Sequence, residues 1–240
     1  MKLTSLLCLG FFLLFAPSLK AQNDPVTDSL NQHNDWPNLR RYRSQNVEAG
    51  LPAPGVNRVV FMGNSITDGW INARPEFFSK NPYVDRGISG QTTPQMLIRF
   101  RQDVIDLKPK VVVILAGIND IAENTGPSSV QMIENNLMSM AQLAKANGIK
   151  VVLCSITPAN AFPWRPGINP VEKIAAVNKW MKNYAAKNNF VFVNYFDAMA
   201  DDQKGLPANL SKDGVHPTPE GYKIMESLVV PGIQQALKRK

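Results

Sequence analysis

The sequence predicts an α/β domain in which a parallel sheet carries helices on both faces. Strand-like and helix-like segments alternate about five times along the chain and are joined by short connectors. The strand-like segments are apolar and rich in β-branched residues, as in KVVVIL at 110–115, a run typical of strands buried on both faces of a parallel sheet. With 240 residues, of which 44% are hydrophobic, the chain can bury the core of one such domain without disulfides or metals.

The predicted elements follow one another in order. Strands are expected at residues 58–62, 84–86, 110–115, 149–155 and 190–193, and helices at 36–48, 93–107, 128–147, 171–187 and 219–237. The run LPAPG separates the first helix from the first strand. Apolar side chains recur at helical spacing in the second helix, as at Met96 and Phe100, and Gly148 ends the third helix.

The first 22 residues differ from the rest of the chain. They combine basic Lys2, a short apolar run and Ala21 near the end, a pattern typical of a secretory signal peptide. The run is too short for a membrane-spanning helix. We therefore expect a signal peptide at 1–22, a polar N-terminal extension at 23–54 and the folded domain at 55–240. The protein is expected to be secreted or periplasmic, without stable membrane insertion.

The two cysteines predict no disulfide. Cys8 lies in the signal region, and the large Leu7 before it disfavours a lipoprotein cysteine. Cys154 is then alone, inside the apolar run VVLCSI, where a buried inert thiol is expected.

Charge and motifs argue against several classes of protein. The formal charge of +7 falls to +5 when the signal peptide takes Lys2 and Lys20 with it, and the remaining basic residues form no face threaded with aromatic residues. No nucleic-acid partner is expected. The chain contains neither G-x-x-x-x-G-K nor G-x-G-x-x-G, and its two histidines are far apart. We expect no metal and no cofactor.

One serine lies where a parallel sheet presents its functional groups. In VVFMGNSITDGW, Ser65 directly follows the first predicted strand, and ligands bind at the carboxyl ends of such strands. A serine becomes a nucleophile when a histidine, oriented by a carboxylate, accepts its proton. His216 lies in a turn-rich loop with Asp213 three residues before it, whereas His33 lies in the polar extension. Taken alone, Asp213 could instead cap a turn, with His216 at the surface.

Two other strand ends offer hydrogen-bond donors. Gly90, in GISGQTT, follows the second strand, and its backbone N–H can approach a ligand because no side chain intervenes. Asn119, in GIND, follows the third strand and could point its amide toward the same crevice. Each stretch seen singly could also be a glycine turn with a helix cap.

Taken together, the blocks GNSIT, GISGQTT, GIND and DGVH resemble, in this order, those of the SGNH (GDSL-type) hydrolase family. The resemblance covers residues 58 to 236. It implies a flavodoxin-like three-layer α/β/α sandwich with about five parallel strands, and esterase activity without a metal or organic cofactor.

The resemblance also implies a role for each residue. Ser65 would be the nucleophile and would contribute its backbone N–H to the oxyanion hole. Gly90 would add a second backbone donor and Asn119 a side-chain donor. His216 would be the general base, oriented by Asp213.

Three neighbours of Ser65 receive separate interpretations. Asn64 stands where the family name has Asp, and an asparagine can make similar turn hydrogen bonds. Asp68 is expected to be an acidic residue at a helix start. Trp70 is expected in the core.

The substrate is less constrained by the sequence. The motif GISGQTTPQML, followed by GIND, is similar to the corresponding sequences of one branch of the family. That branch includes platelet-activating-factor acetylhydrolase-like enzymes and bacterial acetylesterases. It implies short acyl groups, acetyl above all, with a carbohydrate ester as the expected substrate. A lipid ester is the alternative, and a noncatalytic carbohydrate-binding protein is a second one.

The loop at 155–170 follows the fourth strand and is the expected specificity element. Trp164 could stack on a sugar ring or line an acyl pocket, or it could pack under its own proline-rich loop. Arg165 could bind an anion. No oligomeric state is predicted.

Overall fold

A computed structural model describes residues 34–239. Five parallel strands form one sheet in the order β2-β1-β3-β4-β5. The strands are β1 (Val59–Gly63), β2 (Tyr83–Gly87), β3 (Val111–Leu115), β4 (Lys150–Cys154) and β5 (Val191–Val193). This order and the parallel pairing confirm the predicted flavodoxin-like sheet. The predicted signal peptide and His33 lie outside the described residues.

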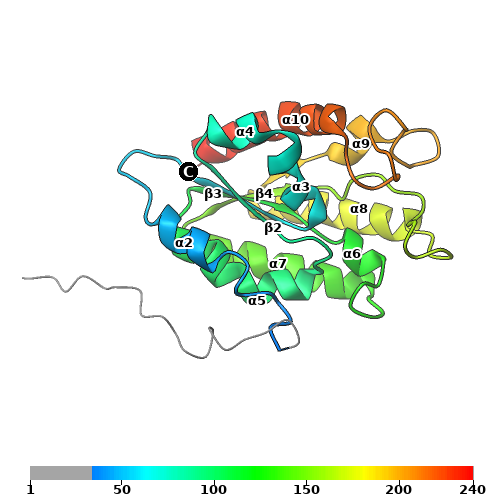
Figure 1. The fold of residues 1–240 in the computed structure, drawn as a ribbon, viewed down its shortest axis with the longest axis horizontal. Coiled ribbons are helices and arrows are strands. Elements are labelled where there is room, and N and C mark those ends of the chain that lie inside the picture. Colours follow the sequence, from blue (N-terminus) through cyan, green and yellow to red (C-terminus); the bar gives the residue numbers. More distant parts are fainter. Residues whose placement is uncertain (1–33, 240) are drawn as a thin grey trace, which may run out of the picture.

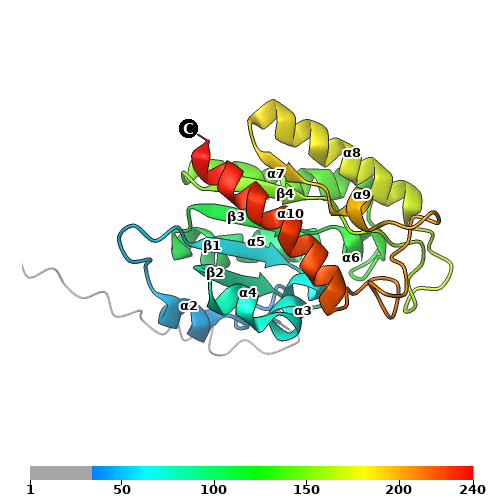
Figure 2. The ribbon, with the colours of Figure 1, turned by 90° about the horizontal axis from the view of Figure 1, so that it is seen from above.

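Helices cover both faces of the sheet, as predicted (Figure 1). One layer holds α5 (Thr93–Asp103), α7 (Val130–Ala146) and α8 (Val171–Asn188), and the other holds α3 (Ser65–Ala73), α4 (Pro75–Ser79) and α10 (Pro219–Lys238). Three short helices complete the described part: α2 (Arg43–Ala49), α6 (Ile118–Ile121) and α9 (Tyr195–Met199). Figure 2 shows α10 crossing the sheet and α2 beside its β2 edge.

The strands place alternate side chains in two cores. In β1, Val60 and Met62 pack against the α5–α7–α8 layer, and Val59 and Phe61 pack against the opposite layer. Cys154 is a fully buried free thiol, as predicted. The prediction that Trp70 belongs to the core is also confirmed, since its side chain is 1% exposed and stacks on Phe77.

Two predicted helices differ from the observed ones. The helix expected at 36–48 begins only at Arg43, because Asn38 has a positive φ of 56° and the segment before Arg43 forms turns. The helix expected at 93–107 ends at Asp103, and a 3₁₀ turn (Ile105–Leu107) continues it. The sequence analysis placed a helix start at Asp68 without giving α3 its bounds, and it did not predict α4, α6 or α9, since each is too short to show a clear period.

The described part of the extension, residues 34–54, packs against the domain. The Tyr42 hydroxyl donates to the Gly87 carbonyl at the end of β2. The buried Arg58 donates to the carbonyls of Ala49 and Gly50, at 2.8 and 2.6 Å. The extension therefore covers the edge strand β2, which would otherwise present unpaired backbone groups. Within residues 34–239, no helix has both the length and the apolar character needed to cross a membrane.

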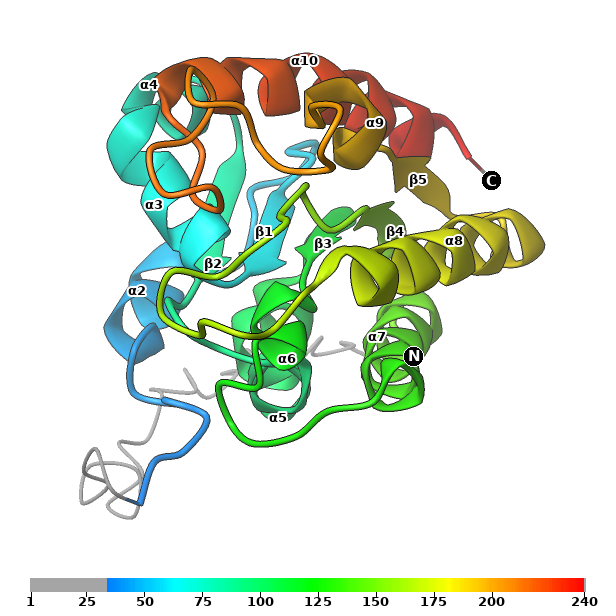
Figure 3. The ribbon, with the colours of Figure 1, turned by 90° about the vertical axis from the view of Figure 1, so that its right-hand side faces the viewer.

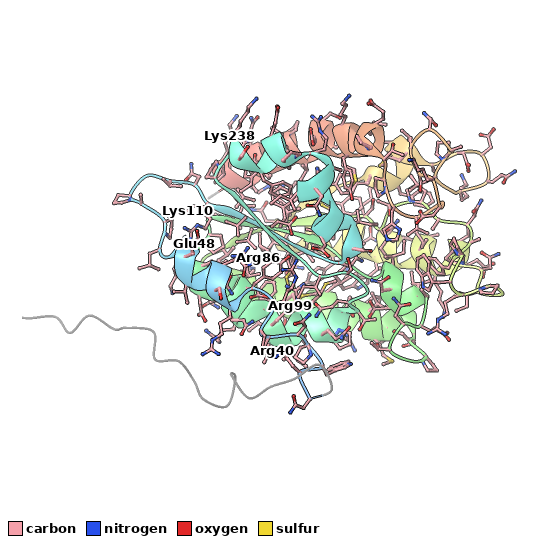
Figure 4. The ribbon with its side chains drawn as sticks, viewed as in Figure 1. Arg40, Glu48, Arg86, Arg99, Lys110 and Lys238 are labelled. Atoms are coloured by element: carbon pink, nitrogen blue, oxygen red, sulfur yellow. The ribbon has the colours of Figure 1, made fainter. Side chains whose placement is uncertain are left out.

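A buried guanidinium joins the two strands that lead to the predicted site. Arg99 of α5 is fully buried and donates to the carbonyls of Gly63 and Arg86, both at 3.0 Å. It also donates to Gln91 Oε1 at 2.6 Å and to the Asp103 carboxylate at 3.0 Å. Arg99 and Arg86 are both buried, and Figure 4 labels them one below the other in the same part of the view. Arg99 thus fixes the ends of β1 and β2 relative to each other.

We expect Arg99→Met to lower the free energy of unfolding by about 3–5 kcal/mol, because it leaves the buried Asp103 carboxylate without its cation. Arg101→Met is the matched control on the same helix. Its guanidinium forms an exposed pair with Asp106 at 3.8 Å, so the change should stay within about 0.5 kcal/mol. Urea denaturation measures both variants. Equal effects would contradict the structural role of Arg99.

Candidate active site

The predicted nucleophile lies at the carboxyl end of the sheet, on the side that Figure 3 faces. Ser65 is the first residue of α3 and follows β1 with only Asn64 between. The Asn64 side chain accepts the N–H of Ile66 at 3.1 Å, which confirms that asparagine makes the turn hydrogen bond here. The N–H of Ser65 belongs to the first helical turn, whose N–H groups have no acceptor within the helix.

The structure brings Ser65, His216 and Asp213 together. His216 Nε2 lies 2.9 Å from Ser65 Oγ, and His216 Nδ1 lies 2.6 Å from Asp213 Oδ2. An ionised carboxylate only accepts hydrogen bonds, so the hydrogen between Asp213 and the ring belongs to Nδ1. Nε2 can then accept the Ser65 hydroxyl proton. Asp213, His216 and Ser65 form one continuous hydrogen-bond chain.

The Asp213 carboxylate is held by its own turn. Its Oδ1 accepts the N–H groups of Val215 and His216 at 2.9 and 2.8 Å, and the Ser211 hydroxyl at 3.1 Å. Burial opposes ionisation, but the hydrogen bonds from the His216 backbone and ring and from Val215 outweigh it. They lower the pKa of Asp213 from 3.8 to about 2. The carboxylate is therefore ionised at neutral pH.

Gly90 lies in the exposed loop after β2, with a positive φ of 79° that favours glycine. Asp68 of α3 holds this loop, because its carboxylate accepts the Ser89 hydroxyl at 2.7 Å and the Ser89 N–H at 3.3 Å. Asp68 lies in the first turn of α3, as predicted, and in addition joins that helix to the loop. Residue 87 must be a glycine for α3 to lie this close to the loop. Any Cβ at this position would lie only 2.1 Å from the Asp68 backbone nitrogen.

Asn119 is buried beneath the same loop. Its side chain is 3% exposed, and its amide donates one hydrogen to the Gln91 carbonyl at 3.0 Å. The amide carries a second hydrogen. The next residue, Asp120, accepts the N–H and hydroxyl of Thr93 at the start of α5. Residues 119 and 120 therefore tie α6 to both ends of the segment from Gln91 to Thr93.

Trp164 reaches across the site from its loop. Its side chain is 39% exposed, its ring centroid lies 6.1 Å from that of His216, and its Nε1 donates to Asn124 Oδ1 at 3.1 Å. It also contacts Phe162 of its own loop. Arg165 is exposed and donates to the Glu123 carbonyl at 3.4 Å.

The contacts of Ser65, His216, Trp164 and the Gly90 loop, together with the chain itself, form a closed ring of residues around the site. Asn124 links two of its parts, since its amide donates to the Gly90 carbonyl at 3.3 Å and accepts from Trp164. We call this ring of residues the rim, and it consists of Ser65, His216, Trp164, Asn124, Gly90, Ser89 and Asp68. The sequence analysis missed Asn124 and the Ser89 contact of Asp68. The available signal was that these residues follow strand ends along the sequence.

Comparisons with known proteins find a matching family and similar solved structures. The model of the GDSL-like lipase/acylhydrolase family matches residues 61–224. A solved structure of a GDSL-like lipase from Bacteroides thetaiotaomicron is 49% identical, with a TM-score of 0.82 over 84% of this chain and 99% of that one. A protein from Bacteroides fragilis is 50% identical, with a TM-score of 0.83 over 85% of this chain and 99% of that one.

Curated relatives are more distant. Esterase TesA of Pseudomonas aeruginosa is 30% identical over 161 residues, which span 65% of this chain and 73% of TesA. An acetylxylan esterase of Geobacillus stearothermophilus is 28% identical over 150 residues, which span 59% of this chain and 67% of that protein. The lipoprotein YqeF of Bacillus subtilis is 33% identical over 129 residues, and that match spans 47% of this chain and only about half, 53%, of the lipoprotein.

The lowered pKa of Asp213 predicts a specific pH dependence of stability. Because the pKa in the folded state lies below 3.8, the carboxylate stabilises the fold above about pH 4 and loses this contribution as the pH falls toward 2. Asp213→Asn should therefore be less stable than the wild type near neutral pH, with a difference that shrinks below about pH 4. Urea denaturation across this range measures it.

Asp202→Asn is the control, because this exposed loop carboxylate accepts none of the hydrogen bonds that hold Asp213. A wild-type advantage over Asp213→Asn that stays constant down to about pH 2 would contradict the assignment.

Proposed function

Because the chain belongs to the GDSL-like lipase/acylhydrolase family, we propose that it is a serine esterase that removes short acyl groups, acetyl above all, from carbohydrate. The observation that carries the proposal is the hydrogen-bond chain from Asp213 through His216 to Ser65. Ser65 is the first residue of a helix, and its Oγ lies 2.9 Å from the unprotonated Nε2 of His216. This arrangement suits proton transfer and nucleophilic attack.

In the first half of the reaction, Ser65 Oγ attacks the ester carbonyl carbon while His216 Nε2 takes its proton. The ionised Asp213 stabilises the imidazolium that forms. The tetrahedral intermediate then collapses, the bond to the alcohol oxygen breaks, and His216 returns the proton to the leaving alcohol. The acyl group stays on Ser65 as an ester.

In the second half, water attacks this acyl ester and His216 again accepts a proton. Collapse of the second intermediate releases the carboxylic acid and returns the proton to Ser65. In both halves a negative charge develops on the carbonyl oxygen. The N–H groups of Ser65 and Gly90 and the second amide hydrogen of Asn119 are the donors we assign to it.

Two observations support an acetylated carbohydrate as the substrate. Trp164 presents a partly exposed indole 6.1 Å from the His216 ring, where it can pack against the apolar face of a sugar. One relative carries the name acetylxylan esterase. We also propose that the protein acts outside the cytoplasm, on the basis of the signal-like first 22 residues and the lipoprotein among its relatives.

The first test is a chain-length profile with p-nitrophenyl acetate, butyrate and octanoate. We expect acetate to give the highest kcat/KM, and Ser65→Ala to lower kcat by at least about 10⁴-fold because no nucleophile remains. Mass spectrometry after treatment with a fluorophosphonate should place a single adduct on Ser65.

Each other outcome is decisive. A preference for octanoate would contradict the short-acyl assignment in favour of a lipid ester. Turnover that survives in Ser65→Ala would exclude this serine as the nucleophile. If no ester is hydrolysed and no adduct forms, the esterase proposal is contradicted, and the alternative of a noncatalytic carbohydrate-binding protein is favoured.

A second test concerns Trp164. We expect Trp164→Ala to raise KM for acetylated oligosaccharides by about tenfold while Ser65 still reacts with p-nitrophenyl acetate, because the lost contact is with the sugar. Arg165→Ala in the same loop is the control, and no change in KM is expected for a neutral substrate. An unchanged KM in Trp164→Ala would contradict the sugar contact.

A further inference from the structure

An open cavity of about 530 Å³ lies between the N-terminal extension and the Gly90 loop. One wall comes from the extension, through Asp35, Trp36, Asn38 and Arg40. The opposite wall comes from Ile88 to Gln91, Gln95, Asn124 and Thr125. Gly90 and Asn124 are also members of the rim. The cavity therefore begins at the loop that carries the proposed oxyanion donor and extends toward the extension.

The backbone of the extension's wall is hydrogen-bonded to the domain. Glutamine side chains on the domain donate to three peptide carbonyls of the extension at 2.7–2.8 Å, namely Gln95 to Trp36, Gln91 to Pro37 and Gln102 to Leu39. The buried Asp35 carboxylate accepts the N–H of Leu39 at 2.7 Å. The side chain of Trp36 takes no part in these bonds and is 48% exposed. A large aromatic ring is thus presented to solvent on a fixed support.

The lining favours a polar ligand that also has an apolar face. The amides of Asn38 and Asn124 and the Thr125 hydroxyl lie in the lining with the Trp36 ring. Asn124 and Thr125 already make hydrogen bonds within the protein, and each keeps capacity for a further one. An alkyl chain would remove these groups from water without giving them partners. A pyranose ring offers hydroxyl groups for the amides and C–H groups for the indole.

The charges in the cavity favour a neutral sugar. Arg40 and Asp35 form an ion pair within one wall, with Arg40 Nε 3.7 Å from the Asp35 carboxylate. Asp35 also accepts the N–H of Arg40 at 3.1 Å. The one acidic and one basic side chain of this wall therefore compensate each other. A uronic acid would have to compete with Asp35 for the guanidinium.

We propose that this cavity is a saccharide-binding site that holds sugar units next to the esterified one. This inference rests on the proposed esterase function, because it assumes that the scissile ester lies between Ser65 and Gly90. It assigns the extension to substrate recognition: the enzyme would act on oligosaccharides better than on single acetylated sugars. Trp36 is the residue that determines this preference.

The test uses monoacetylated neutral xylo-, manno- and cello-oligosaccharides, from a single sugar to a tetrasaccharide, with p-nitrophenyl acetate beside them. For at least one series, kcat/KM of the wild type should rise about tenfold with length, mainly through KM. Trp36→Ala should remove this rise and lower kcat/KM for the tetrasaccharide about tenfold more than that for p-nitrophenyl acetate. Val47→Ala, at a position 63% exposed on α2 of the same segment, should leave both unchanged.

A binding measurement separates recognition from chemistry. Ser65→Ala should bind the deacetylated tetrasaccharide in a calorimetric titration, and Ser65→Ala/Trp36→Ala should bind it about tenfold more weakly. A wild type that hydrolyses p-nitrophenyl acetate but shows no length dependence in any series would overturn this inference alone. Equal losses on all substrates in Trp36→Ala would also overturn it. A wild type without Ser65-dependent turnover would instead contradict the proposed function.

Discussion

The site depends on one buried cation. Arg99 donates to the last carbonyl of β1, at Gly63, and to that of Arg86 near the end of β2. These strands lead directly to Ser65 and to the Gly90 loop. A buried guanidinium is costly unless all its hydrogen bonds are made, so the two strand ends have one favourable relative position. The distance between the proposed nucleophile and the proposed oxyanion donor is therefore set in the core, below the surface that meets the substrate.

Close packing adds a second constraint at the same place. Gly63 and Gly87 are register partners on neighbouring strands, and a Cβ on either would lie about 2 Å from an atom of α3. The helix that begins with Ser65 can therefore lie directly on the strand ends. This position brings Asp68 within hydrogen-bond reach of Ser89. The same helix thus carries the serine and holds the neighbouring loop.

The parts that could be predicted from the sequence are those encoded locally. The strands are recognisable as apolar runs, and the Asp213–His216 contact spans only three residues in a turn. The start of α2 could not be predicted, because the turns before it depend on side-chain capping and on glutamines of α5 far along the chain. The bonds from Asn124 to Gly90 and Trp164 join separate loops, and no local pattern encodes such pairs.

In the proposed function, the residues assigned to chemistry and the two tryptophans assigned to specificity have different structural supports. Buried hydrogen bonds join Arg99 to the carbonyl of Gly63, two residues before Ser65, and Asn119 to Gln91. The Gly90 loop is held by the exposed hydrogen bond from Ser89 to Asp68. Changes in the buried supports should disturb the fold as well as the proposed reaction. Trp36 lies instead on a segment whose backbone is held by Gln95 independently of the ring, and Trp164 is partly exposed on its loop. Substitution of either ring should cost little stability. In the proposed function, these two segments can therefore alter substrate preference while the arrangement of Ser65, His216 and Asp213 is kept.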